Sequence, residues 1–175
     1  KSVMFAVSFK LPAIEYILNV SIATIFNGRG LLPDNFWGVS KNDLGDFDVF
    51  CAKVSDRVTQ LINEKVDARK LKMFDLIYST KGSLSVKEIS ESVHWSSRQI
   101  NRYFTEWFGL SLKTYCTILR FRASFQQIKE GKLFPENDFS DQPHFIKVIK
   151  KYSGHTPKEL YKNKDDRFIQ LSALK

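Results

Sequence analysis

A short segment in the middle of the chain carries four side chains suited to reading nucleic-acid bases. They are Arg98, Gln99, Asn101 and Arg102. An arginine can donate two hydrogen bonds to the major-groove edge of guanine, and an asparagine or glutamine can make a matching pair with adenine. All four fall within the first two turns of a helix that the sequence predicts over residues 96–108. We expect this helix to present them on the face opposite its apolar residues.

A second group of polar side chains lies on a helix predicted over residues 141–152. It consists of Gln142, His144, Lys147 and Lys150. These types suit contacts with base edges and with phosphate oxygens. The two groups together predict two places at which a nucleic acid could be bound.

The elements that must position the first group form two short helices separated by a tight break. A Ser-x-x-Glu pair, Ser85 and Glu88, predicts a capping box at the start of the first helix, and Ser96 with Gln99 repeats the signal at the second. Apolar residues at helical spacing give each helix a buried face: Ile89 and Val93 in the first, and Ile100, Phe104 and Phe108 in the second. This pattern is typical of a helix-turn-helix unit. The alternative is a helical hairpin with a solvated polar face.

The second group has positioning signals of its own. Asp141 is a good N-cap, Gly154 suits the left-handed position that ends a helix, and Thr156 with Glu159 predicts a further capping box. Residues 112–130 predict one long helix of about 28 Å between the two groups. A rod of that length can hold two reading helices on one side of a duplex, whose turn repeats every ~34 Å. A plain core helix is the alternative.

The net charge of +8 is concentrated in the second half of the 175 residues. Residues 1–80 hold 10 lysines and arginines against 9 acidic residues, whereas residues 81–175 hold 17 against 10. A basic excess in the half with both polar groups predicts a polyanionic partner. A membrane surface is the rival partner, but no predicted helix is strongly basic on one face and fully apolar on the other. No apolar run approaches the ~20 residues that span a bilayer.

The first half of the sequence predicts a mainly helical region, and its residues indicate no catalytic or binding site. Alternation over residues 3–9 predicts one short, half-buried β-strand, and helices are expected over residues 12–26, 43–66 and 71–77. Cys51 and Cys116 are expected to be buried thiols in a reducing, cytoplasmic compartment. The chain begins at Lys1 and shows no signal-peptide pattern. We expect residues 1–80 to be the helical remnant of a sensor or dimerisation domain.

Three segments now carry a family resemblance: SVKEISESVHWSSRQINRYFTEWFGLSLKTY, RFRA and FSDQPHFIKVIKKYSGHTPKEL. They resemble the DNA-binding domain of AraC/XylS-type transcriptional regulators, over residues 85 to about 161. The resemblance implies a mainly α fold in which two helix-turn-helix units, joined by a long helix, present recognition helices to successive major grooves. It implies base contacts by Arg98, Asn101 and Arg102 and by Gln142, Pro143, His144 and Lys147.

The resemblance also sets the expected domain limits and partners. Residues 81–162 would form the DNA-binding domain. Residues 163–175 remain as a tail, and its four apolar residues, Phe168, Ile169, Leu171 and Leu174, predict that it docks on its own domain, with a partner as the alternative surface. The expected partners are double-stranded DNA, RNA polymerase, a second copy in a homodimer, and a small-molecule effector bound through a portion upstream of Lys1. No membrane partner and no cofactor is expected.

The chain departs from the family pattern before the second reading helix. The segment GKLFPENDF, residues 131–139, is too short for the supporting helix usual at this place, and Pro135 disfavours helix at Phe134. We expect a loop here, with Phe134 and Phe139 packed underneath as substitutes. For the helix predicted over residues 141–152, this departure favours contacts with phosphate oxygens over contacts with base edges.

Other chemistry finds little support in the sequence. His94, His144 and His155 lie in separate elements, and neither cysteine is at metal-ligand spacing from them. No phosphate-binding glycine motif and no nucleophile–base constellation is present. We expect a sequence-specific DNA-binding transcriptional regulator and no enzymatic activity. The alternative is a protein-interaction module that keeps the fold and has lost specific DNA binding, with RNA binding a distant third.

Overall fold

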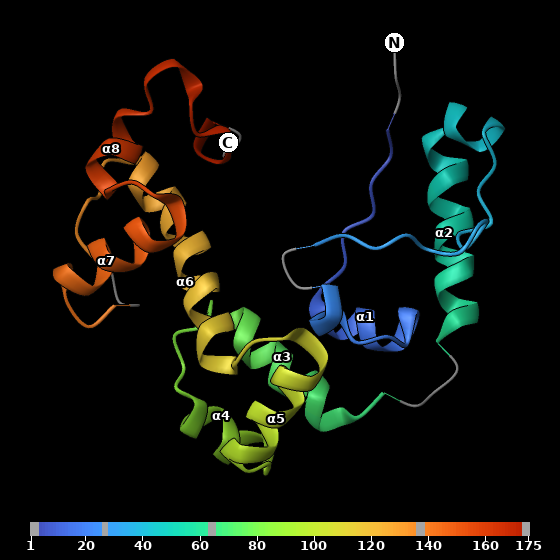
Figure 1. Cartoon of the computed structure of the whole chain (residues 1–175), viewed down its shortest axis with the longest axis horizontal. Helices are drawn as coiled ribbons and strands as arrows, with labels where there is room; N and C mark the ends of the chain where they lie inside the picture. Colours follow the sequence, from blue (N-terminus) through green and yellow to red (C-terminus); the bar gives the residue numbers. More distant parts are fainter. Residues whose placement is uncertain (1–3, 26–27, 63–65, 136–138, 173–175) are drawn as a thin grey trace.

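The computed structural model describes residues 4–25, 28–62, 66–135 and 139–172 of the chain. Within these ranges the protein is mainly helical, as the sequence predicts. Figure 1 shows a group of helices (α3, α4 and α5) from which α6 leads to a second group (α7 and α8), while α1 and α2 lie on the opposite side of the first group. None of the described helices combines the length and apolar character of a bilayer-spanning segment.

The N-terminal region differs from the sequence prediction in two places. Residues 4–10 form no strand, because the described chain offers no second strand to complete a hydrogen-bonded ladder; Val3 lies outside the described residues. The single helix expected over residues 12–26 is two elements in the described chain, α1 (Leu11–Leu18) and the 3₁₀ turn η1 (Ile22–Ile25), and Phe26 lies outside the described residues. Asn19, at φ 49°, ends α1 in the left-handed conformation.

The next helix is shorter than predicted. After the 3₁₀ turn η2 (Asn42–Gly45), α2 runs over Phe47–Leu61, so it starts later than the predicted residue 43 and ends before Ile62. Residues 63–65 of the predicted helix lie outside the described residues. It begins there because the Asp46 carboxylate accepts hydrogen bonds from the N–H groups of Asp48 and Val49. Cys51 is exposed on α2, so the expectation that both thiols are buried holds only for Cys116. The apolar stripe of α2 turns only partly inward, since Phe50 and Val54 are buried but Phe47 is 59% exposed.

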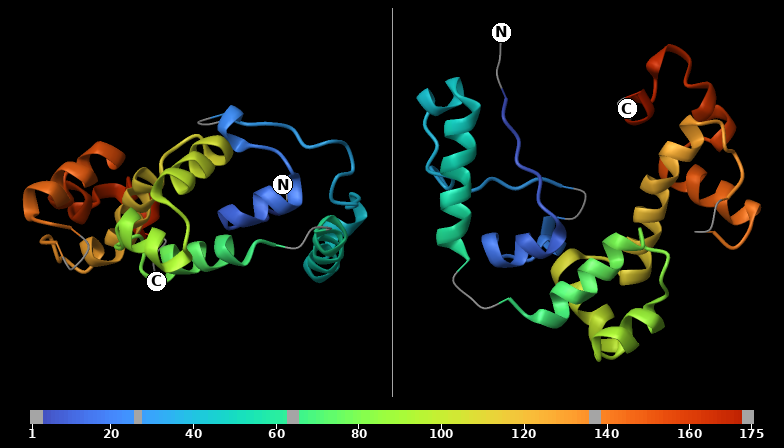
Figure 2. Two further views of the ribbon diagram at one scale, coloured as in Figure 1. Left: turned by 90° about the horizontal axis from the view of Figure 1, so that it is seen from below. Right: turned by 180° about the vertical axis from the view of Figure 1, so that it is seen from behind.

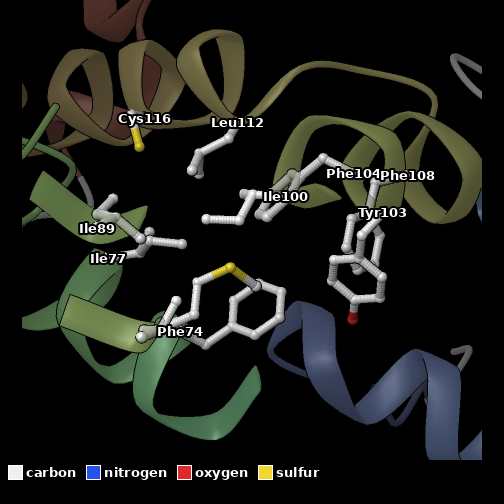
Figure 3. Packing of buried hydrophobic residues seen from close by; sticks show 11 residues of the cluster. Phe74, Ile77, Ile89, Ile100, Tyr103, Phe104, Phe108, Leu112 and Cys116 are labelled. Carbon is white, nitrogen blue, oxygen red and sulfur yellow. The ribbon is translucent and has the colours of Figure 1, made fainter. Parts of the chain in front are cut away.

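The first group of helices consists of α3 (Ala68–Ser79), α4 (Val86–Val93) and α5 (Ser97–Phe108), which surround one apolar core. Figure 3 shows side chains from all three helices meeting there with Leu112 and Cys116. From α3 the core takes Met73, Phe74 and Ile77, whereas Leu71 is exposed. This core therefore begins before residue 81, the expected start of the DNA-binding domain.

The second group of helices is built on the far end of α6 (Leu112–Lys129), which starts where the long helix was predicted and ends one residue earlier. It contains α7 (Gln142–Ser153), α8 (Pro157–Lys162), the 3₁₀ turn η3 (Lys164–Asp166) and α9 (Ile169–Ser172). Figure 2 shows the two groups at opposite ends of α6. The buried side chains of this second core are Ile128, Phe145, Ile149, Leu160 and Leu171. Leu171 and Phe168 come from the tail, so its predicted docking on its own domain is confirmed for these two residues. Ile169 is 71% exposed, and Leu174 lies outside the described residues.

Candidate nucleic-acid interface

The break between α4 and α5 is held by hydrogen bonds at every residue. His94 ends α4 at φ 53°, and the N–H groups of His94 and Trp95 both donate to the Ser90 carbonyl. The Ser90 hydroxyl donates to the Trp95 carbonyl at 2.7 Å. Ser96 then starts α5 with the predicted capping box. The relative direction of the two helices is therefore fixed by local bonds as well as by the core.

The capping box of α4 is also present as predicted. The Ser85 hydroxyl accepts from the Glu88 N–H, and the Glu88 carboxylate accepts from the Ser85 N–H at 2.7 Å. This hydrogen bonding by Ser85 lowers the pKa of the Glu88 carboxyl. The helix start is therefore stabilised with an ionised acid at its positive end.

One side of α5 is anchored in the first core. Ile100, Phe104 and Phe108 are fully buried, as predicted, and Tyr103 is buried beside them. The sequence analysis did not single out Tyr103, although its place three residues after Ile100 fits the same inward stripe. With four large side chains buried on one side, the opposite side of α5 has a fixed orientation.

Arg98 and Arg102 lie on the outer side of α5 and are exposed. The Arg102 side chain is 72% exposed, and its Nε is 3.9 Å from Glu106 Oε1, a loose contact between residues four apart. Arg98 makes no hydrogen bond or ion pair with any residue that the structure describes. Both guanidinium groups can therefore turn toward an external acceptor.

Gln99 and Asn101 are less available than their types suggest. The Gln99 Oε1 accepts from the N–H and the hydroxyl of Ser96, at 3.0 and 2.7 Å. Gln99 thus takes the place in this capping box that Glu88 takes in the capping box of α4. The Asn101 Nδ2 donates to the Ser97 carbonyl at 3.0 Å. A paired contact with adenine needs both the oxygen and the nitrogen of the amide, so either residue would have to give up a bond it makes here.

The second predicted group separates into two pairs on α7. Gln142 and His144 are half-buried, whereas Lys147 and Lys150 are exposed. Ser140 Oγ lies 3.2 Å from His144 Nδ1, and the imidazole packs edge-on against the Phe139 ring, 5.8 Å between centroids. The described environment thus uses His144 within the protein and leaves the two lysines to solvent.

One of the two rings expected to pack under α7 does so; residues 136–138 of the predicted loop lie outside the described residues. Phe139 packs under α7, 5.0 Å from Phe145 between ring centroids. The guanidinium of Arg120 lies over the Phe139 ring, 5.8 Å from its centroid. Phe134, expected to pack underneath as well, is 68% exposed. The Gln127 side chain instead donates to the Phe134 carbonyl at 3.2 Å, which holds the backbone at this point while the ring turns outward.

The N-terminal region contributes contacts to α5 that the sequence analysis missed. The Tyr103 hydroxyl donates to Glu15 of α1, and the Ser21 hydroxyl donates to the Glu106 carbonyl near the end of α5. Ala23 of η1 approaches Gly109, where an added Cβ would lie 3.1 Å from Ala23 Cα. Local spacing carries no signal for such contacts, because the partners are more than 80 residues apart.

Comparisons with known proteins identified no relative of this chain. No family model matches the chain, and neither the curated proteins nor the solved structures gave a match. Within the described ranges, no cluster of three or more histidine, cysteine, aspartate or glutamate side chains is placed to hold a metal ion.

Proposed function

We propose that the chain is a sequence-specific, double-stranded DNA-binding transcriptional regulator in which α5 reads base edges in the major groove. The observation that carries the proposal is the two-sided arrangement of α5. Its apolar side is locked in the first core, while Arg98 and Arg102 project from the other side as exposed guanidinium groups. Guanine recognition needs a fork of donors of this kind on a helix that cannot rotate away.

The polar side chains of α7 support a different role for this helix. Lys147 and Lys150 are exposed, whereas the better base-reading types, Gln142 and His144, are half-buried. Lysine is a point charge that suits phosphate, and phosphate contacts fix orientation on the duplex without reading sequence. We assign to α7 the clamping of a phosphate backbone, with base reading left to α5. Such a regulator would act by recruiting or excluding RNA polymerase near a promoter.

The proposal is tested by selecting duplexes from a random pool with the full chain and then titrating salt. The selected duplexes should share a sequence motif that contains at least one guanine, the base that an arginine of α5 would contact. If the four exposed cations assigned to the duplex, Arg98, Arg102, Lys147 and Lys150, each contact a phosphate, the slope of log K against log salt should be about −3 to −4, at about −0.9 per phosphate contact. The double variant Lys147→Ala/Lys150→Ala should reduce the slope by about 2 and leave the selected motif unchanged.

A protein-interaction module is the second candidate, and one observation favours it. Phe134 and Phe47 are exposed large rings, a residue type enriched in the buried centres of protein–protein interfaces. Failure to bind any duplex at low salt would support this candidate, since non-specific DNA binding is strongest there.

A further inference from the structure

A second site lies in the N-terminal region, away from α5 and α7. It is a cavity of about 290 Å³ between α1, α2 and the extended segments around residues 5–9 and 32–37. Phe5, Phe9 and Trp37 supply aromatic walls, and Ala13, Ile14 and Ile17 of α1 supply one side. The rings of Phe9 and Trp37 are stacked 5.7 Å apart, and Phe5 lies 4.9 Å from Phe50.

The lining determines what could occupy this cavity. Every described side chain that lines it is apolar, and none carries a charge. A charged ligand would lose its hydration there without gaining a partner, whereas a flat ring could stack on the aromatic walls. An apolar protein cavity of about 150 Å³ holds benzene, so this volume has room for a two-ring molecule. We propose that the cavity binds a neutral, aromatic small molecule of about two rings.

The helix that forms one side of the cavity is bonded to α5 on its other side. Residues 13, 14, 17 and 18 of α1 line the cavity, whereas Glu15 pairs with Lys70 of α3 and accepts the Tyr103 hydrogen bond at 2.5 Å. In Figure 3 the Tyr103 hydroxyl points toward α1, the blue helix. A ligand that shifts or stiffens α1 therefore acts on the helix that carries Arg98 and Arg102. The effect on duplex affinity rests on the proposed function; ligand binding itself does not.

The test uses the full chain, with indole as the neutral probe and indole-3-carboxylate as its charged counterpart. Ligand-observed NMR should show that indole binds at least about tenfold more tightly than the carboxylate, since the charge has no partner in the cavity. Ala13→Leu fills part of the cavity from α1 and should abolish indole binding. Ala52→Leu, the same change at an exposed position of α2, is the matched control and should bind indole as the wild type does.

The coupling is measured separately by amide hydrogen exchange and by duplex affinity. Indole should change the exchange of α5 amides in the wild type, and this change should be smaller in Tyr103→Phe, which still binds indole. No indole binding by the wild type, or equal binding by Ala13→Leu, overturns the proposal. A wild type that binds indole but no duplex supports the cavity and contradicts the proposed function, whereas one that binds duplex but not indole contradicts the cavity alone.

Discussion

The Tyr103 hydroxyl donates a hydrogen bond to Glu15 Oε2 at 2.5 Å, joining the buried side of α5 to a helix 88 residues earlier in the chain. The same carboxylate forms an ion pair with Lys70 of α3, and the Glu15 side chain is only 11% exposed. Burial, followed by the hydrogen bond to Glu15, raises the pKa of Tyr103 above its ordinary value. One carboxylate thus connects three helices.

Replacing Tyr103 by phenylalanine should lower the free energy of unfolding by about 1.5–3 kcal/mol, because a hydrogen bond to a charged, largely buried group is lost. Urea denaturation at pH 7 measures this loss. Tyr161→Phe is the control, since the Tyr161 side chain is exposed and its hydroxyl makes no hydrogen bond with a described residue. Equal losses in the two variants would show that the Glu15 contact contributes nothing.

The stability should also fall at alkaline pH in a way that depends on Tyr103. Its folded-state pKa is raised, so its contribution is fully present below the unfolded value of about 10 and is lost as the pH rises above that value. Above pH 10 the free energy of unfolding should fall by about 1.4 kcal/mol per pH unit for each tyrosine of this kind. Urea midpoints measured between pH 9 and 11 should fall more steeply for the wild type than for Tyr103→Phe. Parallel curves would contradict the assignment.

Arg102→Ala should weaken binding to the selected duplex by about 1–3 kcal/mol, or about 5- to 150-fold, if the guanidinium reads a base. Binding to an unrelated duplex should change much less, which a fluorescence anisotropy titration at fixed salt can measure. Lys41→Ala, at an exposed position before η2, is the control for loss of one positive charge. The same loss on every sequence would make Arg102 a phosphate contact only.

Gly82 and Gly154 offer a matched pair for backbone geometry. Both have φ of +78°, but a Cβ on Gly82 would lie 2.6 Å from the Cys116 carbonyl oxygen, whereas nothing lies within 4 Å at Gly154. Each alanine variant carries the left-handed cost of about 1–2 kcal/mol. Gly82→Ala should cost about 1–3 kcal/mol more, because backbone must also move. Urea midpoints that fall equally would mean that the turn at Gly82 adapts without strain.

The two thiols should react differently in the native protein. Burial raises the pKa of Cys116 to about 11, so its reactive thiolate is scarce at pH 8, while Cys51 is exposed. A thiol-specific chromogenic disulfide should therefore titrate one thiol at pH 8 and two in denaturant. Cys51→Ser should leave no fast thiol in the native state; a fast second thiol in the wild type would contradict the buried position of Cys116.

Sequence reasoning succeeded where the signal is local. The capping boxes at Ser85, Ser96 and Thr156 and the N-cap at Asp141 place helix starts that the structure confirms. Each signal depends only on residues within one helical turn, so tertiary packing has little power to override it. The inward stripe of α5 was predicted for the same reason.

The errors come from features that depend on distant partners. Residues 3–9 have the alternation of a strand, but a strand needs a neighbour that the described chain does not supply. Phe134 has the hydrophobicity of a core residue, yet its backbone is held by Gln127 with the ring outside. Gln99 satisfies two patterns at once, a capping box and a base-reading set, and only coordinates decide which bonds its amide makes.

The helix α6 belongs to both cores, since Leu112 and Cys116 lie in the first and Ile128 in the second. Each residue of an α-helix advances the axis by 1.5 Å and turns it by about 100°. Inserting one residue in the middle of α6 would therefore swing α7 about a quarter-turn around that axis, with both cores intact. Inserting seven residues would bring α7 back nearly to its original azimuth, about 10 Å farther away. The angle and the spacing between Arg102 of α5 and Lys147 of α7 therefore depend on the number of residues in α6.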